Sequence, residues 1–331
     1  MPPASHDNLI GPAALCRLLG TAHPLVQGGM VWCTNAALVT AVARAGGLGT
    51  LGAGSMYPAE LRTEIEAVKA SFDGPFAVNV PLLYPAVEEH MKTIVELGVP
   101  VVITSAGSPK KWTEFLKDHG VVVVHVVSSA AFAEKSQAAG VDVVVAEGFE
   151  AGGHNGREET TTMCLVPEVV NAVDLPVIAA GGISCGRTML AALALGASGV
   201  QMGSRFVATV ESPAHRDFKA HVLAAKAGAT QLRLKSVTPV RMLDNLEGGF
   251  SQQVAQAESR SADVKELQEL LGRGRAKLGM REGDLLEGEL EIGQVAARLI
   301  DLPSAGDVVL DVVAEFEAVR MGLAGPSFHW S

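Results

Sequence analysis

Short apolar runs recur along the first two thirds of the chain, and each run ends near Gly, Asn or Ser. The runs are continuously apolar instead of alternating, which is typical of parallel strands that are buried on both faces. The pattern predicts eight strands, at residues 24–27, 48–51, 76–80, 101–104, 121–126, 143–147, 177–180 and 199–202.

Amphipathic segments alternate with these runs, and several of them begin at a proline or end just before a glycine, as helices do. They predict eight helices, at residues 35–45, 58–71, 85–97, 109–119, 130–139, 165–173, 186–195 and 213–225. Eight strand–helix units over about 200 residues are typical of the α/β fold known as the (β/α)8 or TIM barrel. A doubly wound open sheet is the alternative, with its ligand at a strand-order switch point. The count of eight and the polar residues at the strand ends favour the barrel.

The alternation of strands and helices stops near residue 228. We therefore expect a barrel over residues 10–227 and a C-terminal extension over residues 228–331. Helical patterns at residues 261–271 and 308–321, with no sign of a second sheet, predict a mostly helical extension that packs on the barrel.

Composition narrows the class of protein. Hydrophobic residues make up 48% and charged residues 19% of the chain, which is too apolar for a disordered protein. The net charge of -10 disfavours nucleic acid as a partner, because phosphate binding needs a cationic surface. No apolar run reaches the ~20 residues that span a bilayer, and no signal peptide is seen. We expect a cytoplasmic protein that does not bind membranes.

No metal centre is predicted. The four cysteines (Cys16, Cys33, Cys164 and Cys185) lack the spacing of metal ligands, and we expect them to be free thiols. The acidic segment 281–294 is expected to form a solvated loop and the start of a helix.

Glycine-rich sequences follow the last two predicted strands. Gly181 and Gly182 follow the seventh strand, and Gly203 and Ser204 follow the eighth. Barrels of this kind bind phosphate groups with the loops after these two strands, where glycine lets backbone N–H groups approach an anion. The sequence therefore predicts a cofactor that bears a phosphate.

Gly28, Gly29 and Met30 follow the first predicted strand, where they could lie along a flat ring. Gln27 and Asn79 offer amide groups to the edge of a heterocycle. The alternative is that both amides satisfy backbone groups at the ends of their strands.

Two charged residues stand at strand ends. Glu147 closes the buried sixth strand and needs a partner, which is either a cofactor hydroxyl or a protein group. Arg205 follows the eighth strand, where it either balances a phosphate charge or forms an ion pair with Glu211.

The loop after the sixth strand carries His154. Of the nine histidines, His154 alone lies in a glycine-rich loop at a strand end, whereas His125 lies inside the apolar fifth strand. Histidine exchanges protons near neutral pH, so His154 is the candidate base. The alternative is a loop histidine that is hydrogen-bonded to backbone.

Several motifs, taken in order, resemble those of the 2-nitropropane dioxygenase-like flavoproteins, which include nitronate monooxygenases and flavin-dependent enoyl-ACP reductases. The motifs are Gln27-Gly-Gly-Met-Val-Trp32, Ala45-Gly-Gly-Leu-Gly49, Phe76-Ala-Val-Asn79, Ala146-Glu-Gly-Phe-Glu-Ala-Gly-Gly-His154, Ala179-Ala-Gly-Gly-Ile183 and Gln201-Met-Gly-Ser-Arg-Phe206. The resemblance spans residues 10–225 and reappears at Ile292-Gly-Gln294, which resembles a family segment near the flavin.

This resemblance implies a (β/α)8 barrel with tightly bound FMN and with His154 at the position of the family's catalytic histidine. The positions that match the family's flavin contacts are Gln27, Gly28, Gly29, Met30, Asn79, Glu147, Gly152, Gly153, Gly181, Gly182, Gly203 and Ser204. The implied activity is that of a nitronate monooxygenase, which oxidises nitronates or nitroalkanes with O2 to a carbonyl compound and nitrite. One alternative is an NAD(P)H-dependent FMN reductase of an enoyl-ACP or a quinone, and another is a flavin-binding sensor without turnover. The expected partners are a small-molecule substrate and a second copy of the chain in a homodimer.

The loop around His154 leaves the subclass open. Some nitronate monooxygenases and quinone reductases carry Glu-Cys-Ala-Gly-His-Pro here, and a lysine after the histidine of the fifth strand. This chain has Glu150-Ala-Gly-Gly-His-Asn155, and Val126 follows His125. The Ala-Gly-Gly form is shared by the enoyl reductases and by other nitronate monooxygenases.

Overall fold

A computed structural model describes residues 10–323 of the chain. The eight predicted strands are present, each within two residues of its predicted bounds, and all of their pairings are parallel. They run in the sheet order β1-β9-β8-β6-β5-β4-β3-β2. The strands are β1 (Leu25–Gln27), β2 (Thr50–Gly52), β3 (Ala77–Pro81), β4 (Val101–Ser105), β5 (Val122–Val127), β6 (Val143–Glu147), β8 (Val177–Ala180) and β9 (Gly199–Met202).

The sheet closes between its two outer members, β1 and β2. Val26 forms a parallel bridge with Leu48, and the N–H of Gln27 donates to the carbonyl of Leu48 at 2.9 Å. The Gln27 side chain extends this contact: its Oε1 accepts from the N–H of Thr50 at 3.0 Å, and its Nε2 donates to the Thr50 carbonyl at 3.2 Å. The (β/α)8 prediction is confirmed.

Helices cover the outside of the barrel. Side-chain caps start two of them: Asn35 accepts from the N–H of Leu38, and Ser129 accepts from the N–H of Phe132. A short 3-10 turn, η2 (Ala53–Ser55), follows β2. The barrel helices are α2 (Ala36–Arg44), α3 (Pro58–Ser71), α4 (Val87–Glu96), α5 (Lys110–Asp118), α6 (Ala130–Ala138), α7 (Thr162–Ala172) and α8 (Gly186–Ala194).

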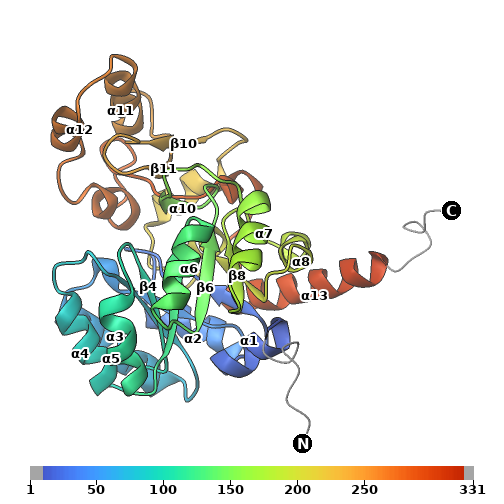
Figure 1. The fold of residues 1–331 in the computed structure, drawn as a ribbon. Coiled ribbons are helices and arrows are strands. Elements are labelled where there is room, and N and C mark those ends of the chain that lie inside the picture. Colours follow the sequence, from blue (N-terminus) through green and yellow to red (C-terminus); the bar gives the residue numbers. More distant parts are fainter. Residues whose placement is uncertain (1–9, 324–331) are drawn as a thin grey trace, which may run out of the picture.

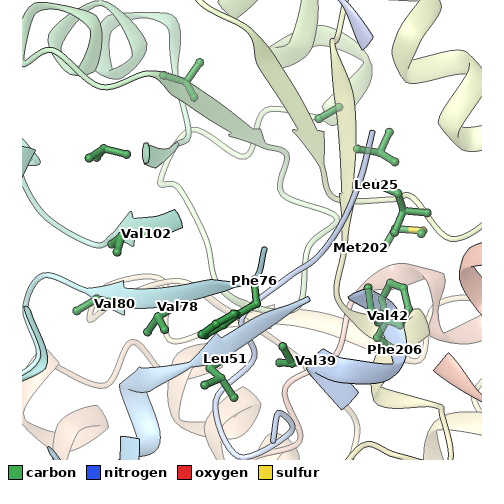
Figure 2. Close-up of a cluster of buried hydrophobic side chains, with 14 of the residues drawn as sticks. Leu25, Val39, Val42, Leu51, Phe76, Val78, Val80, Val102, Met202 and Phe206 are labelled. Carbon is green, nitrogen blue, oxygen red and sulfur yellow. The ribbon is translucent and has the colours of Figure 1, made fainter. Parts of the chain in front are cut away.

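Alternate strand residues supply two apolar layers. One layer lies between strands and helices and includes Val78, and Figure 2 shows Leu51 of this layer beside Val39 of α2. The other layer fills the barrel interior, and α1 (Pro12–Leu19) contributes Leu15 and Leu19 to it. Helix α1 therefore packs against the barrel interior, and the barrel is a filled core instead of a pore.

The eighth barrel helix differs from the prediction. The segment predicted for that place forms α10 (Arg216–Leu223), whose Phe218 and Val222 are buried in the core of the extension. Instead α13 (Ala305–Leu323), near the C-terminus, packs against both α8 and α2 and completes the ring (Figure 1). After β9 the chain forms only the short α9 (Ser204–Val207) before it leaves the barrel.

The prediction of no second sheet was wrong. A three-stranded antiparallel sheet joins β10 (Thr230–Arg233) and β11 (Val240–Leu243) of the extension to β7 (Gly153–His154) of the barrel loop. Figure 1 shows β10 and β11 with two helices in a lobe at one end of the barrel. The extension is mostly helical, as predicted; its remaining elements are α11 (Phe250–Ser259), α12 (Val264–Leu271), η3 (Lys277–Arg281) and η4 (Gln294–Arg298).

Two further findings concern the whole described chain. The four cysteines are free thiols, as predicted. Within residues 10–323, no helix is long and apolar enough to cross a membrane.

Candidate active site

A cavity of about 1220 Å³ lies between the carboxyl ends of the barrel strands and the extension. It brings together every candidate site residue of the sequence except Gln27 and Arg205. The candidates that line it are Gly28, Gly29, Met30, Asn79, Glu147, Gly152, Gly153, His154, Gly181, Gly182, Gly203 and Ser204.

Gln27 is fully buried and does not line the cavity. Its amide group bonds the backbone of Thr50, and its Nε2 also donates to the carbonyl of Gly28. These contacts favour the alternative that the sequence left open, in which Gln27 satisfies backbone groups where β1 meets β2.

The two predicted phosphate loops face the cavity side by side, because β8 and β9 are neighbouring strands. Gly181 and Gly182 have positive φ angles of 91° and 70°, a conformation that favours glycine. A Cβ atom on Gly181 would lie 2.7 Å from the carbonyl oxygen of Gly148. Ser204 accepts a hydrogen bond from the N–H of Gly293 at 2.8 Å, which leaves its own hydroxyl proton available to a ligand.

Arg205 takes neither of its predicted roles. Its guanidinium pairs with Asp301 at 2.8 Å and donates to the carbonyl of Ala208 at 2.8 Å. Glu211 instead accepts from the N–H of Ala305 at 2.8 Å. Both side chains thus hold the segment that leads into α13, and Arg205 does not line the cavity.

In the loop after β1, Gly29 lies directly against Asn79 of β3. A Cβ atom on Gly29 would stand 2.3 Å from the Cβ of Asn79. The Asn79 amide donates to the carbonyl of Ile103 at 3.1 Å, so this residue both bonds β4 and lines the cavity.

Gln201 is a cavity residue that the sequence reasoning missed. Its Oε1 is buried and has no hydrogen-bond partner in the described part of the chain. An unpaired buried carbonyl costs roughly 1–3 kcal/mol, and a ligand N–H would remove that cost. The residue opens the Gln201-Met-Gly-Ser motif, which was the available signal.

Glu147 and His125 are further polar groups in the cavity wall. Burial raises the pKa of Glu147 to about 7, and no group of residues 10–323 hydrogen-bonds its carboxyl. Burial lowers the pKa of His125 to about 4, and its Nδ1 lies 2.7 Å from the Thr104 hydroxyl. His125 is therefore neutral at physiological pH, and the carboxyl of Glu147 can form a hydrogen bond with a ligand hydroxyl.

His154 is held by backbone pairing while its side chain stays free. It pairs with Val240 in the small sheet, and the N–H of Asn155 donates to the carbonyl of Pro239 at 2.9 Å. The Asn155 amide bonds the carbonyls of Ala151 and Gly153 and so stiffens the loop. The imidazole is exposed to the cavity and makes no hydrogen bond to the described residues, which disfavours the backbone-bonded alternative.

The acidic segment 281–294 is not the solvated loop that was expected. Glu289 is buried, with 6% of its surface exposed, and Glu291 lines the cavity. Glu291 forms a bridge with Met242 of β11, and its Oε2 lies 2.7 Å from the position of a Cβ atom on Gly153. Charged residues in a row look solvated in a sequence, and only the pairing with β11 turns them inward.

The Ile292-Gly-Gln294 segment lies at the cavity, as its resemblance implied. A Cβ atom on Gly152 would lie 2.5 Å from the carbonyl carbon of Ile292. The N–H of Gln294 donates to the carbonyl of Glu150 at 3.0 Å. The extension backbone therefore lies directly against the loop that carries His154.

Comparison with known proteins gives the family. The family model described as nitronate monooxygenase matches residues 13–315. A Rhodococcus jostii (strain RHA1) protein named (3aS,4S,5R,7aS)-5-hydroxy-7a-methyl-1-oxo-octahydro-1H-indene-4-carboxyl-CoA dehydrogenase is 33% identical over 91% of this chain and 95% of its own length. A probable nitronate monooxygenase of Staphylococcus saprophyticus is 31% identical over 90% of this chain and 96% of its own length.

Solved structures agree with this assignment. FabK from Thermotoga maritima is 39% identical, with a TM-score of 0.88 over 94% of this chain and 98% of that chain. Nitroalkane oxidase from Streptomyces ansochromogenes is 28% identical, with a TM-score of 0.80 over 93% of this chain and 99% of that chain. The chain belongs to the nitronate monooxygenase family of flavin-dependent oxidoreductases.

Proposed function

We propose that the chain is an FMN-dependent oxidoreductase in which His154 transfers a proton beside the flavin. The observation that carries this proposal is the placement of His154. Its imidazole, which forms no hydrogen bond with the described residues, opens into the same cavity as the two glycine loops after β8 and β9. A base and an anion-binding wall thus share one site.

The cavity fits FMN in its donors and acceptors. The loops at Gly181–Gly182 and Gly203–Ser204 suit the phosphate, and the unpaired Oε1 of Gln201 suits a ring N–H. The unpaired carboxyl of Glu147 suits a ribityl hydroxyl. Bound there, FMN supplies the electron-transfer chemistry that no side chain of the cavity can supply.

The first candidate reaction is the oxidation of a nitronate or nitroalkane with O2 to a carbonyl compound and nitrite. The family model supports it, and so does the likeness to a nitroalkane oxidase. His154 would remove the proton from the carbon that bears the nitro group, or its protonated form would hold the nitronate anion. The pKa of His125, lowered by burial to about 4, keeps a second imidazolium from competing for that anion.

The second candidate is the NAD(P)H-dependent reduction of an acyl thioester, and the size of the cavity favours it. The cavity extends past the glycine loops to Tyr84, Phe132 and Arg157, which is more room than FMN and a small nitroalkane need. The likeness to FabK and to a dehydrogenase of a carboxyl-CoA supports the same reading. In this reaction His154 would deliver a proton to the substrate instead of removing one.

Anaerobic mixing of the FMN-loaded protein with NADH, NADPH or a nitronate in separate cuvettes tests the two candidates. Bleaching of the flavin absorbance by the nitronate alone supports the first candidate. Bleaching by a nicotinamide alone, followed by reoxidation with an unsaturated acyl-CoA, supports the second. A flavin that no donor reduces would overturn both and favour a flavin-binding sensor, and a protein that cannot be loaded with FMN would overturn the cofactor assignment.

A further inference from the structure

Two carboxyl groups of the extension lie next to His154 and have no evident partner of their own. Glu289 and Glu291 are separated by one residue on the segment that bridges to Met242 of β11. Neither carboxyl is hydrogen-bonded by any group within residues 10–323. Buried acids are normally paired, so their position calls for an explanation.

The contacts place both acids beside the loop of His154. The Oε2 of Glu291 lies 2.7 Å from the position that a Cβ atom would take on Gly153, the residue that precedes His154. Burial and then the neighbouring charge of Glu291 raise the pKa of Glu289 to about 8, and the charge of His154 acts on it in the opposite direction. Val240 and Met242 of β11 pair with His154 and Glu291 respectively, so one strand fixes the spacing between base and acid.

The other charged groups nearby do not neutralise the pair. Arg275 also acts on Glu289, but its guanidinium is bound to the Glu287 carboxylate at 3.1 Å. Cys33 faces Glu291 as a neutral thiol, because burial raises its pKa to about 12. Of the two cationic groups that act on Glu289, Arg275 has a carboxylate within 4 Å, whereas His154 has none among the described residues.

We propose that Glu289 and Glu291 are the charge partners of His154 and stabilise the imidazolium that forms when His154 holds a proton during turnover. This inference rests on the proposed function of His154 as the proton-transfer group. Two neighbouring carboxyls in a buried site resist double ionisation, so the pair keeps a proton near neutral pH. The remaining negative charge of the pair favours the protonated form of the His154 ring.

The test is an NMR titration of the FMN-loaded protein with 13C-labelled histidine, in which the His154→Gln variant assigns the His154 signal. In Glu291→Gln, the titration midpoint of His154 should move to lower pH by about 0.5 unit or more, because the variant lacks a negative charge that favours the protonated ring. Glu289→Gln should move it in the same direction, and Glu291→Asp should restore most of the shift. The acidic limb of the kcat/KM profile should move with the NMR midpoint.

Glu282→Gln is the matched control, since Glu282 lies on the same segment but is solvent-exposed and pairs with Lys277. It should leave the midpoint of His154 unchanged. Coincident titrations of the wild type, Glu289→Gln and Glu291→Gln would overturn the inference. The proposed function is read separately, from the anaerobic reduction of the flavin, so a protein that still reduces its flavin with unshifted titrations disproves only the role of the acid pair.

Discussion

At the scale of single residues, the site depends on which polar groups are left without a protein partner. Gln27 and Asn79 look alike in the sequence, yet the Gln27 amide is taken up by the backbone groups of Thr50 and Gly28. The side chains of His154, Glu147 and Gln201 can still form hydrogen bonds with a ligand in the cavity. An unpaired polar group costs free energy when it is buried, so Gln201 and Glu147 in particular indicate where ligand atoms would lie.

Replacing His154 with Ala tests its role most directly. The backbone pairing with Val240 does not need the imidazole, so the variant should fold and keep its FMN. Turnover should fall by roughly 10²–10⁴-fold, the usual contribution of a general acid or base. Steady-state kinetics and the flavin absorbance measure the two effects. His119→Ala, at an exposed histidine after α5, is the control, and near wild-type turnover in His154→Ala would contradict the role.

The carboxyl of Glu147 predicts a pH dependence of stability. Burial raises its pKa to about 7 in the folded protein, whereas an exposed glutamate titrates near ~4.3. The folded state holds this proton where the unfolded chain has lost it, so the free energy of unfolding falls as pH rises between these two values. Glu147→Gln should remove about 1–2 kcal/mol of that fall, a discounted figure because the side chain is only half-buried.

Urea unfolding of flavin-free protein at about pH 5 and about pH 8 measures this difference, over the window set by the two pKa values. Glu282→Gln should retain the full dependence of the wild type. If the free energy of unfolding changes with pH equally in the wild type and in Glu147→Gln, the carboxyl is solvated in the flavin-free protein.

At the scale of elements, the barrel was predictable because each of its strands is a continuous apolar run, and each run is buried on both faces. Strands β10 and β11 were not predicted because each has only four residues, and polar residues interrupt both of their sequences, Thr-Gln-Leu-Arg and Val-Arg-Met-Leu. The position of α13 was not predicted either, because sequence periodicity shows that a helix is amphipathic but not which groove it fills. The residues of the site followed from motifs, whereas Glu289 and Glu291 depend on pairing between distant segments.

Gly186 tests the position of α13 in the ring. A Cβ atom on this residue, at the start of α8, would lie 2.1 Å from the backbone nitrogen of Phe316. Gly186→Ala should therefore push α13 away and lower stability by about 1–3 kcal/mol, as overpacking does. Thermal or urea unfolding measures the change. Gly322→Ala, near the end of α13 with no atom within 4 Å, should not destabilise the protein.

At the scale of the whole molecule, the barrel and the extension share one cavity and cannot be ordered independently. The chain leaves the barrel after α9, forms the lobe, lines the cavity with Ile292 and Gly293, and returns as α13. The His154 loop is in turn a strand of the lobe's sheet. Since FMN is proposed to contact the barrel loops, its binding should stabilise both parts through these shared contacts.

Thermal unfolding at increasing FMN concentration checks this coupling. A ligand that binds only the folded state adds about 2.7 kcal/mol at 100 times its Kd, so the transition should move steadily upward. Protease cleavage in the lobe, around the exposed Arg273 and Lys265, should slow in parallel although neither residue lines the cavity. The variant Gly293→Ala, whose Cβ would lie 2.9 Å from both the Glu150 carbonyl and the Ser204 hydroxyl, should weaken this protection. If FMN does not change the rate of cleavage in the lobe, the extension folds independently of the site. The barrel would then bind FMN without help from the lobe.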